Sequence, residues 1–214
     1  MTGSGPGRTD ILRRDLARFL KTCGFGVEEL RTKIDIVRSE FADTHGYDPV
    51  EHAETWLTTP DSVLDEADPP LRVEDLGRDV AGIRLTCAVT ADVYRVRDLL
   101  VARRDVRVIE ARDYIKRAGP DGYRGLCLVV EVPVASTGRV RTVYVEVQIR
   151  TGVMESWESV ATRLRTEFDG HVPREMLDEL RAAAESARDL DSRIGALQRH
   201  VEERSEADRD APPA

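Results

Sequence analysis

The sequence predicts an α+β fold, in which a small mixed, largely antiparallel sheet is flanked by helices. Three observations lead to this prediction. Apolar residues recur at helical spacing up to residue 46, strict alternation follows over residues 139–150, and helical spacing returns after residue 152. The chain of 214 residues suits one domain with appended helices. We therefore expect a single domain over residues 9–204.

The N-terminal part of this domain, residues 9–58, is predicted to consist of helices. A first apolar stripe ends at Gly24 and a second ends at Gly46. A third, short helix is expected to begin at Pro49 and to end before Pro60.

The segments outside these helices are predicted to be irregular. Residues 59–77 are acidic and contain prolines, so we expect a loop with at most one helical turn. Residues 1–8 are rich in glycine, and residues 205–214 are polar and end in prolines. Both ends are predicted to be disordered tails.

Residues 78–151 form the predicted sheet core. Strands are expected at 80–89, 106–111, 125–134 and 139–150, with a helix at 91–104. The last strand alternates most clearly, with the aliphatic side chains Val143, Val145, Val147 and Ile149 on one face. Glu146, Gln148 and Arg150 share the other face, which by default is the solvated side of an antiparallel sheet.

Residues 152–204 are predicted to form the C-terminal helices, of which the last is long. From Leu180 an apolar seam recurs at alternating intervals of three and four residues up to Val201, which is a heptad repeat. Two interpretations stay open: packing against the first helices of the same chain, or a contact between subunits. The second interpretation predicts a homo-oligomer through helices.

The composition excludes several functional classes. The formal net charge of −8 argues against binding along a nucleic-acid backbone, so a nucleic-acid partner is not expected. Three cysteines without a C-x-x-C spacing argue against a disulfide framework or a zinc site and fit a reducing compartment. No membrane span or apolar leader is recognised, and a cytoplasmic protein is expected.

The polar residues of neighbouring strands suggest a chemistry. Asp79 and Glu146 supply hard oxygen ligands for a metal, Arg84 supplies a cation for phosphate charge, and Tyr123 supplies an aromatic surface for a base. This is the set that Mg²⁺-assisted phosphoryl transfer requires.

Five short motifs then occur in order along the chain. They are D-V-A-G-I-R (79–84), R-D-Y-I-K (112–116), G-Y-R-x-L (122–126), E-V-Q-I-R-T (146–151) and M-x-x-W (154–157). Together they resemble the synthetase domain of the RelA/SpoT family, and more closely its small alarmone synthetases. The resemblance implies a nucleotidyltransferase-like fold with N-terminal helices and a long C-terminal helix. It also implies transfer of pyrophosphate from ATP to the 3′-hydroxyl of GDP or GTP, which makes the (p)ppGpp of the stringent response.

The resemblance assigns roles to single residues. Glu146, Asp79 and Arg84 would be catalytic, and Asp79 and Glu146 would hold Mg²⁺. Glu146 would also draw the proton from the 3′-hydroxyl. Arg84 and Ser62 would lie at the donor nucleotide.

The acceptor nucleotide has its own implied set. Tyr123 would stack on the guanine, Arg112 would meet the acceptor phosphates, and Gln148 and Lys116 would complete the acceptor side.

The sequence departs from the family pattern at several positions, among them five where a basic residue or a histidine is expected. Trp56, Thr58 and Glu66 stand where the donor site of the family has cations. Gly119 stands in place of a basic residue and Cys127 in place of a histidine. Loss of one preorganised charge-stabilising group typically costs about 3 kcal/mol of transition-state stabilisation.

Three hypotheses follow. The chain is an alarmone synthetase with an altered donor site, or a degenerate homologue that binds a guanine nucleotide or a protein partner, or a transferase with changed substrates.

Overall fold

The computed structural model describes residues 8–66, 76, 80–136 and 139–210. Within these residues the chain forms five helices and five strands. Their order is α1 (Arg8–His45), β1 (His52–Leu57), α2 (Pro60–Glu66), β2 (Ala81–Cys87), α3 (Thr90–Ala102), β3 (Arg107–Asp113), β4 (Leu126–Ser136), β5 (Arg139–Thr151), α4 (Gly152–Glu167) and α5 (Arg174–Asp210).

The five strands form one mixed sheet with the order β1-β2-β5-β4-β3. Only the β2–β5 pair among the described strands is parallel, and the other three pairs are antiparallel. The parallel pair is made possible by the crossover through α3, because parallel neighbours cannot be joined by a tight turn. The predicted α+β class and the largely antiparallel sheet are confirmed.

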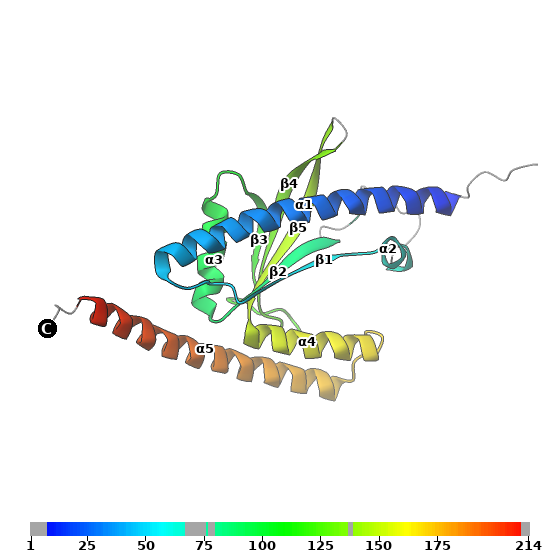
Figure 1. Cartoon of the computed structure of the whole chain (residues 1–214). Coiled ribbons are helices and arrows are strands. Elements are labelled where there is room, and N and C mark those ends of the chain that lie inside the picture. The colour runs from blue at the N-terminus through cyan, green and yellow to red at the C-terminus, as the bar shows by residue number, and fades with distance from the viewer. Residues whose placement is uncertain (1–7, 67–75, 77–79, 137–138, 211–214) are drawn as a thin grey trace, which may run out of the picture.

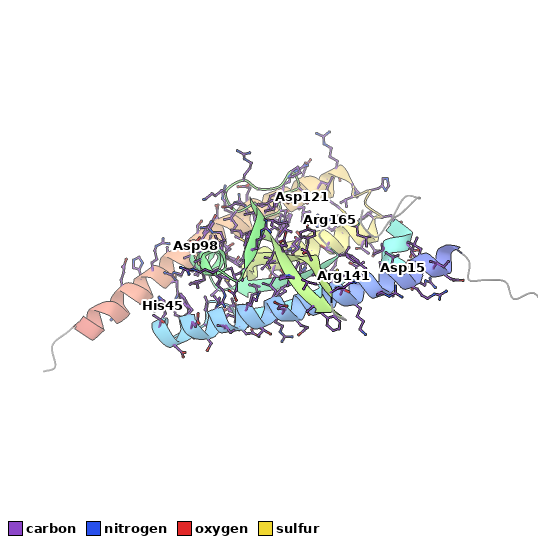
Figure 2. All side chains as sticks on the ribbon, turned by 90° about the horizontal axis from the view of Figure 1, so that it is seen from above. Asp15, His45, Asp98, Asp121, Arg141 and Arg165 are labelled. Atoms are coloured by element: carbon purple, nitrogen blue, oxygen red, sulfur yellow. The ribbon has the colours of Figure 1, made fainter. Side chains whose placement is uncertain are left out.

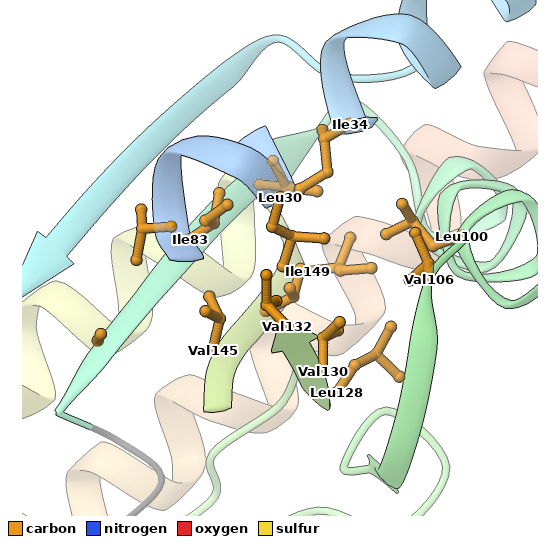
Figure 3. Packing of buried hydrophobic residues seen from close by; sticks show 14 of the residues in the cluster. Leu30, Ile34, Ile83, Leu100, Val106, Leu128, Val130, Val132, Val145 and Ile149 are labelled. Carbon is orange, nitrogen blue, oxygen red and sulfur yellow. The ribbon is translucent and has the colours of Figure 1, made fainter. Parts of the chain in front are cut away.

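The aliphatic face of the sheet is covered by α1. This helix runs across the strands from the region of Asp15 to His45, as Figures 1 and 2 show. Leu30 and Ile34 of α1 pack against Ile83, Val145 and Ile149 of the sheet (Figure 3). Leu100 of α3 joins the same core. One face of β5 is therefore fully committed to packing, which leaves its polar face for other contacts.

The structure corrects the prediction for residues 9–58. α1 is one continuous helix through Gly24, and residues 52–57 form the edge strand β1 rather than a third helix. Since all six residues of β1 pair with β2, the strand owes its conformation to a partner some thirty residues further along the chain. A local apolar pattern does not report such a partner.

Two further boundaries differ from the prediction. The segment after Pro60 forms the seven-residue helix α2, which is longer than the single turn expected. At the C-terminal end, α5 continues to Asp210, although a tail was expected from residue 205. The tail predicted at residues 1–8 falls almost wholly on residues that the structure does not describe, as do residues 211–214.

The C-terminal helices lie on the other side of the sheet from α1 (Figure 1). α4 begins directly after β5, and the Thr151 hydroxyl caps it by accepting from the Met154 amide at 3.2 Å. α5 packs on α4 and α3, and Trp157 of α4 donates to the carbonyl of Leu180 at 2.9 Å. Among the described residues, no helix combines the length and the apolar character that crossing a membrane requires.

Candidate active site

The strand register brings the polar residues of distant sequence segments onto one face of the sheet. Paired residues on neighbouring strands point to the same face. One row across the sheet consists of Glu54, Arg84, Gln148, Cys127 and Arg112. The next row consists of Trp56, Gly82, Glu146, Val129 and Glu110. Four of the eight predicted site residues, namely Arg84, Gln148, Arg112 and Glu146, therefore lie within these two rows.

A chain of hydrogen bonds and ion pairs joins the polar side chains of β5 to β2. Gln148 donates from Nε2 to Oε1 of Glu146 at 2.9 Å, and Arg150 donates to Oε1 of Gln148 at 2.5 Å. Arg150 also contacts Glu155 at 3.0 Å, and Glu155 contacts Arg84 at 3.2 Å. The predicted residues Glu146, Gln148 and Arg84 are thus connected through Arg150 and Glu155, for which no role was predicted.

Arg150 corrects the expectation that the polar face of β5 is solvated. Its side chain is only 3 % exposed, because α4 folds back over the end of the strand. A buried guanidinium requires compensating partners. Glu155 and Gln148 supply these, together with the ring of Tyr123, whose centroid lies 5.2 Å from the Arg150 guanidinium carbon.

Tyr123 leaves a tight turn whose backbone is closed on itself. The amide of Gly119 donates to the carbonyl of Tyr123 at 2.9 Å, and Gly122 adopts a φ of 99°, which favours glycine. The Tyr123 ring packs edge-on against Tyr114 with centroids 5.3 Å apart, and its hydroxyl lies 3.5 Å from Sγ of Cys127. Burial raises the pKa of the Tyr123 phenol, so the ring stays neutral.

The C-terminal helices hold this turn from outside. Asp121 accepts from the Tyr123 amide through Oδ1 at 3.0 Å and from Arg165 of α4 through Oδ2 at 2.9 Å. Asp121 and Arg165 lie next to each other in Figure 2. Gly122 is seated so close to α5 that an added Cβ would lie 2.9 Å from the Cβ of Ala184. The position of Tyr123 is therefore set jointly by its own turn and by α4 and α5.

Trp56 lies on the same face, at the edge strand. It pairs with Gly82, and the missing side chain of Gly82 leaves room for the indole. The guanidinium carbon of Arg84 lies 5.8 Å from the Trp56 ring, which is within cation–π range. Where the family pattern has a cation, this chain therefore has an aromatic group next to Arg84.

The other predicted binding residues have the following positions. Arg112 is half exposed and forms an ion pair with Glu110 at 2.6 Å. Lys116 is exposed, and its Nζ lies 3.6 Å from Asp113. Ser62 lies on α2, away from the two rows, where it exchanges a hydrogen bond with Thr59 at 3.0 Å. Asp79 lies outside the described residues.

The positions that depart from the family pattern take structural roles. The amide of Thr58 donates to the carbonyl of Val80 at 2.8 Å, and Gly119 closes the Tyr123 turn. Cys127 sits between Gln148 and Arg112 in its row, and burial raises the pKa of its thiol. The thiol is therefore neutral and supplies no charge to the site. Glu66 is the last residue of α2.

Glu155 and Arg150 are the residues of the site that the sequence analysis missed. Arg150 belongs to the E-V-Q-I-R-T motif and shares the polar face of β5 with Glu146 and Gln148, and this position was a signal that could have found it. Glu155 stands inside M-x-x-W at a position that this motif leaves open, and only the return of α4 toward the sheet reveals its contacts.

The residue types fit a divalent metal in part. Within the described part of the chain, no group of three or more His, Cys, Asp or Glu side chains is arranged to hold a metal ion. Mg²⁺, however, commonly binds through one or two carboxylates and completes its shell with phosphate oxygens and water. Gln148 engages Oε1 of Glu146, and a carboxylate retains further acceptor capacity. Glu146 is therefore suited to be such a ligand.

Comparison with known proteins gives consistent matches. Residues 68–168 match the family described as "Region found in RelA / SpoT proteins". The chain is 32 % identical over 184 residues to the GTP pyrophosphokinase YwaC of Bacillus subtilis, which covers 83 % of this chain and 88 % of that protein. The small alarmone synthetase 1 of Bacillus subtilis, solved with its product pppGpp, is similar with a TM-score of 0.80 and 30 % identity, covering 88 % of this chain and 98 % of the other. The same synthetase bound to AMPCPP gives a TM-score of 0.72 and 27 % identity, over 89 % of this chain and 99 % of the other.

Proposed function

The chain belongs to the RelA/SpoT family, and from this membership we propose that it is an alarmone synthetase. It transfers pyrophosphate from ATP to the 3′-hydroxyl of GDP or GTP and so makes (p)ppGpp. The observation that carries the proposal is the connected set of polar side chains on β5, Glu146, Gln148 and Arg150. Through Glu155 this set is linked to Arg84, and Arg150 also contacts the ring of Tyr123.

In this proposal the acceptor lies against β5 and the Tyr123 turn. Tyr123 stacks on the guanine, and its ring is held in place by Arg150 and Tyr114. Gln148 orients Glu146 through their hydrogen bond, and Arg112 and Lys116 meet the acceptor phosphates from the adjoining strand end. Glu146 then takes the proton of the 3′-hydroxyl. Positioning of this kind accounts for most of the catalysis in such transfers.

The donor nucleotide is assigned to the side of the sheet formed by β1 and β2. Arg84 neutralises charge on the donor phosphates, and Ser62 contributes from α2. Glu146 and Asp79 would hold Mg²⁺, which when bound supplies charge neutralisation at the transferred phosphate oxygens.

A second candidate is a degenerate synthetase that binds a guanine nucleotide or a protein partner without turnover. One observation favours it: Trp56 lies over Gly82, the residue that pairs with Glu146, and so covers sheet surface on the donor side. Donor cations at Trp56 and Thr58 are absent from this sequence.

A turnover assay separates the two. The purified protein is incubated with Mg²⁺, ATP and GDP or GTP, and we expect a 3′-pyrophosphorylated guanosine nucleotide together with AMP. The Glu146→Gln variant is expected to lose at least about 100-fold in rate, because it removes the proton acceptor. A Trp56→Arg/Thr58→Lys variant is expected to use ATP more efficiently than the native chain.

Calorimetric titration with GDP, GTP and ppGpp completes the comparison. Binding without any product over hours, in the native chain and in the Trp56→Arg/Thr58→Lys variant, would favour the degenerate candidate. No binding of any of the three nucleotides would contradict the synthetase and the nucleotide-binding form of the degenerate candidate, and would leave only the form that binds a protein partner.

We further propose that the protein acts as a homo-oligomer assembled through its helices, in the cytoplasm where its nucleotides are available. The free thiols of Cys23, Cys87 and Cys127 are compatible with that compartment. The apolar residues that α5 leaves exposed, among them Leu190 and Leu197, support the oligomer.

A further inference from the structure

Glu155, in the first turn of α4, accepts hydrogen bonds from two arginines that lie on different strands. Its Oε1 lies 3.2 Å from Nη1 of Arg84 on β2, and its Oε2 lies 3.0 Å from Nη1 of Arg150 on β5. Each carboxylate oxygen thus serves a different guanidinium. The side chain of Glu155 is 29 % exposed, that of Arg84 31 % and that of Arg150 3 %. The contacts are therefore partly shielded from water and are stronger than surface ion pairs.

The two arginines belong to different halves of the site. Arg84 contacts Trp56 and is assigned to the donor. Arg150 contacts the ring of Tyr123 and the amide of Gln148, which are both assigned to the acceptor. Glu155 is therefore a side chain that touches both halves at once.

We propose that Glu155 is a positioning residue that couples occupancy of the donor half to binding in the acceptor half. This inference rests on the proposed function. Donor phosphates at Arg84 compete with Glu155 for the same guanidinium. Once Arg84 is engaged by phosphate, Glu155 pairs with Arg150 alone and fixes it against Tyr123 and Gln148.

The expected sign of the coupling is positive. An Arg150 that is already fixed loses less conformational freedom when the acceptor base stacks on Tyr123, so the acceptor binds more tightly. By thermodynamic linkage, the acceptor must then increase donor affinity by the same factor.

The test measures the dissociation constant of GDP by calorimetry, with and without a saturating concentration of AMPCPP. We expect AMPCPP to tighten GDP binding at least about five-fold in the native chain, and less than about two-fold in Glu155→Gln. Glutamine replaces one carboxylate oxygen by a donor amide and carries no charge, so one of the two arginines loses the oxygen to which it now donates. Glu155→Asp keeps both oxygens on a shorter stem and is expected to give an intermediate factor.

The matched control is Glu29→Gln on α1. Glu29 forms an ion pair with Lys33 at 3.4 Å, and α1 covers the opposite sheet face, so this change removes an ion pair without touching the site. It is expected to leave the coupling factor unchanged. The titrations are repeated in reverse, with AMPCPP binding measured with and without saturating GDP, and must give the same coupling factor. A merely structural loss in Glu155→Gln would lower the GDP affinity equally with and without AMPCPP, so the ratio of these two affinities would not change.

Two results would overturn the inference: GDP affinity in the native chain that does not respond to AMPCPP, or full coupling that persists in Glu155→Gln. In both cases the two nucleotides still bind, so the proposed function stands. If neither nucleotide binds the native chain, the proposed function fails and the role of Glu155 fails with it.

Discussion

At the scale of single residues, Gly82 determines what Trp56 is able to contact. A Cβ built on Gly82 would lie 2.2 Å from Cζ2 of Trp56 and 2.6 Å from the carbonyl oxygen of Glu146. The indole therefore rests directly on the β2 backbone, next to the strand that carries Glu146. A side chain of any size at this position competes with the indole and with the neighbouring strand.

We expect Gly82→Ala to lower the free energy of unfolding by about 1–3 kcal/mol, because the added methyl group overpacks this contact. Urea unfolding followed by circular dichroism measures the change. Gly152→Ala is the matched control: nothing lies within 4 Å of its added Cβ, so its stability should be unchanged or raised by up to about 1 kcal/mol. Equal stabilities of the two variants would contradict the contact.

Asp191 is a second residue whose surroundings determine its chemistry. It is 5 % exposed and accepts from the Thr151 hydroxyl at 2.9 Å, so it ties α5 to the junction of β5 and α4. Burial raises the pKa of this carboxyl, while Thr151 and Arg124 act in the opposite direction. The folded state therefore binds the proton of Asp191 more tightly than the unfolded chain does.

This raised pKa gives a pH-dependent prediction. The stabilising contribution of the Asp191 carboxyl is complete below the ordinary pKa of Asp and is lost as the pH rises through the raised folded-state pKa. Asparagine keeps an acceptor for Thr151 without titrating, so Asp191→Asn should gain stability relative to the native chain as the pH rises above the ordinary pKa of Asp, which is about 4. Asp191→Ala leaves the Thr151 hydroxyl without its acceptor and should cost about 1–3 kcal/mol.

Urea unfolding of the three proteins at several pH values checks this. A difference between the native chain and Asp191→Asn that does not change with pH would show that the carboxyl keeps an ordinary pKa.

At the scale of elements, α1 shows why a glycine does not always end a helix. The buried residues Leu20, Cys23, Val27 and Leu30 form one stripe at intervals of three and four residues, and this stripe passes through both Gly24 and Gly26. Packing along the stripe outweighs the conformational cost of two glycines. Gly26 also has a packing reason to be small, because it faces the β4–β5 part of the sheet.

The two glycines should respond oppositely to the same substitution. An alanine Cβ at Gly24 meets only Leu57 at an ordinary 3.5 Å, so Gly24→Ala should raise the free energy of unfolding by about 0.5–1 kcal/mol. At Gly26 the Cβ would lie 2.4 Å from Cγ2 of Val143, so Gly26→Ala should lower it by about 1–3 kcal/mol. Thermal and urea unfolding measure both. Shifts of the same sign would show that α1 does not approach the sheet this closely.

The helices and strands also show how much of the fold is predictable from the sequence. β2, α3, β4 and β5 were predictable because their local patterns match their burial, as in the alternation that places Val145 and Val147 in the core. β1 was not predictable, since only two of its six residues are even partly buried and its conformation comes from pairing with β2.

The candidate site divides in the same way. Glu146, Gln148 and Arg84 could be selected from their strand positions, whereas the role of Glu155 depends on where α4 returns to the sheet. Residue type and period are local properties, and the burial of Arg150 is a tertiary one.

At the scale of the whole molecule, α5 leaves most of its apolar seam uncovered. Leu180 is buried, but Leu190, Leu197 and Val201 are 48 %, 69 % and 60 % exposed. The principal contacts of α5 are with α4 and α3, so the seam does not pack against the first helices as one interpretation expected. An apolar groove between α4 and α5, lined by Val153, Val160 and Leu190, continues this surface. These residues support the subunit contact that we propose.

A substitution that places charge on the seam tests that contact. If the seam joins two copies, each fully buried leucine contributes about 1.5–3 kcal/mol to association. Leu190→Glu/Leu197→Glu removes that contribution and adds charges that are costly to bury. The native chain should sediment as a multiple of 24.0 kDa, and the variant should sediment at 24.0 kDa or dissociate with a constant raised at least about tenfold.

Ser192→Glu adds a charge to an exposed position of α5 outside the seam, and it should assemble like the native chain. Circular dichroism of all three proteins establishes that α5 remains folded. A native chain that sediments at 24.0 kDa at tens of micromolar would exclude the oligomer. Equal dissociation of Ser192→Glu would place the contact on another face of α5, because a seam that alternates three and four residues presents a single side of the helix to its partner.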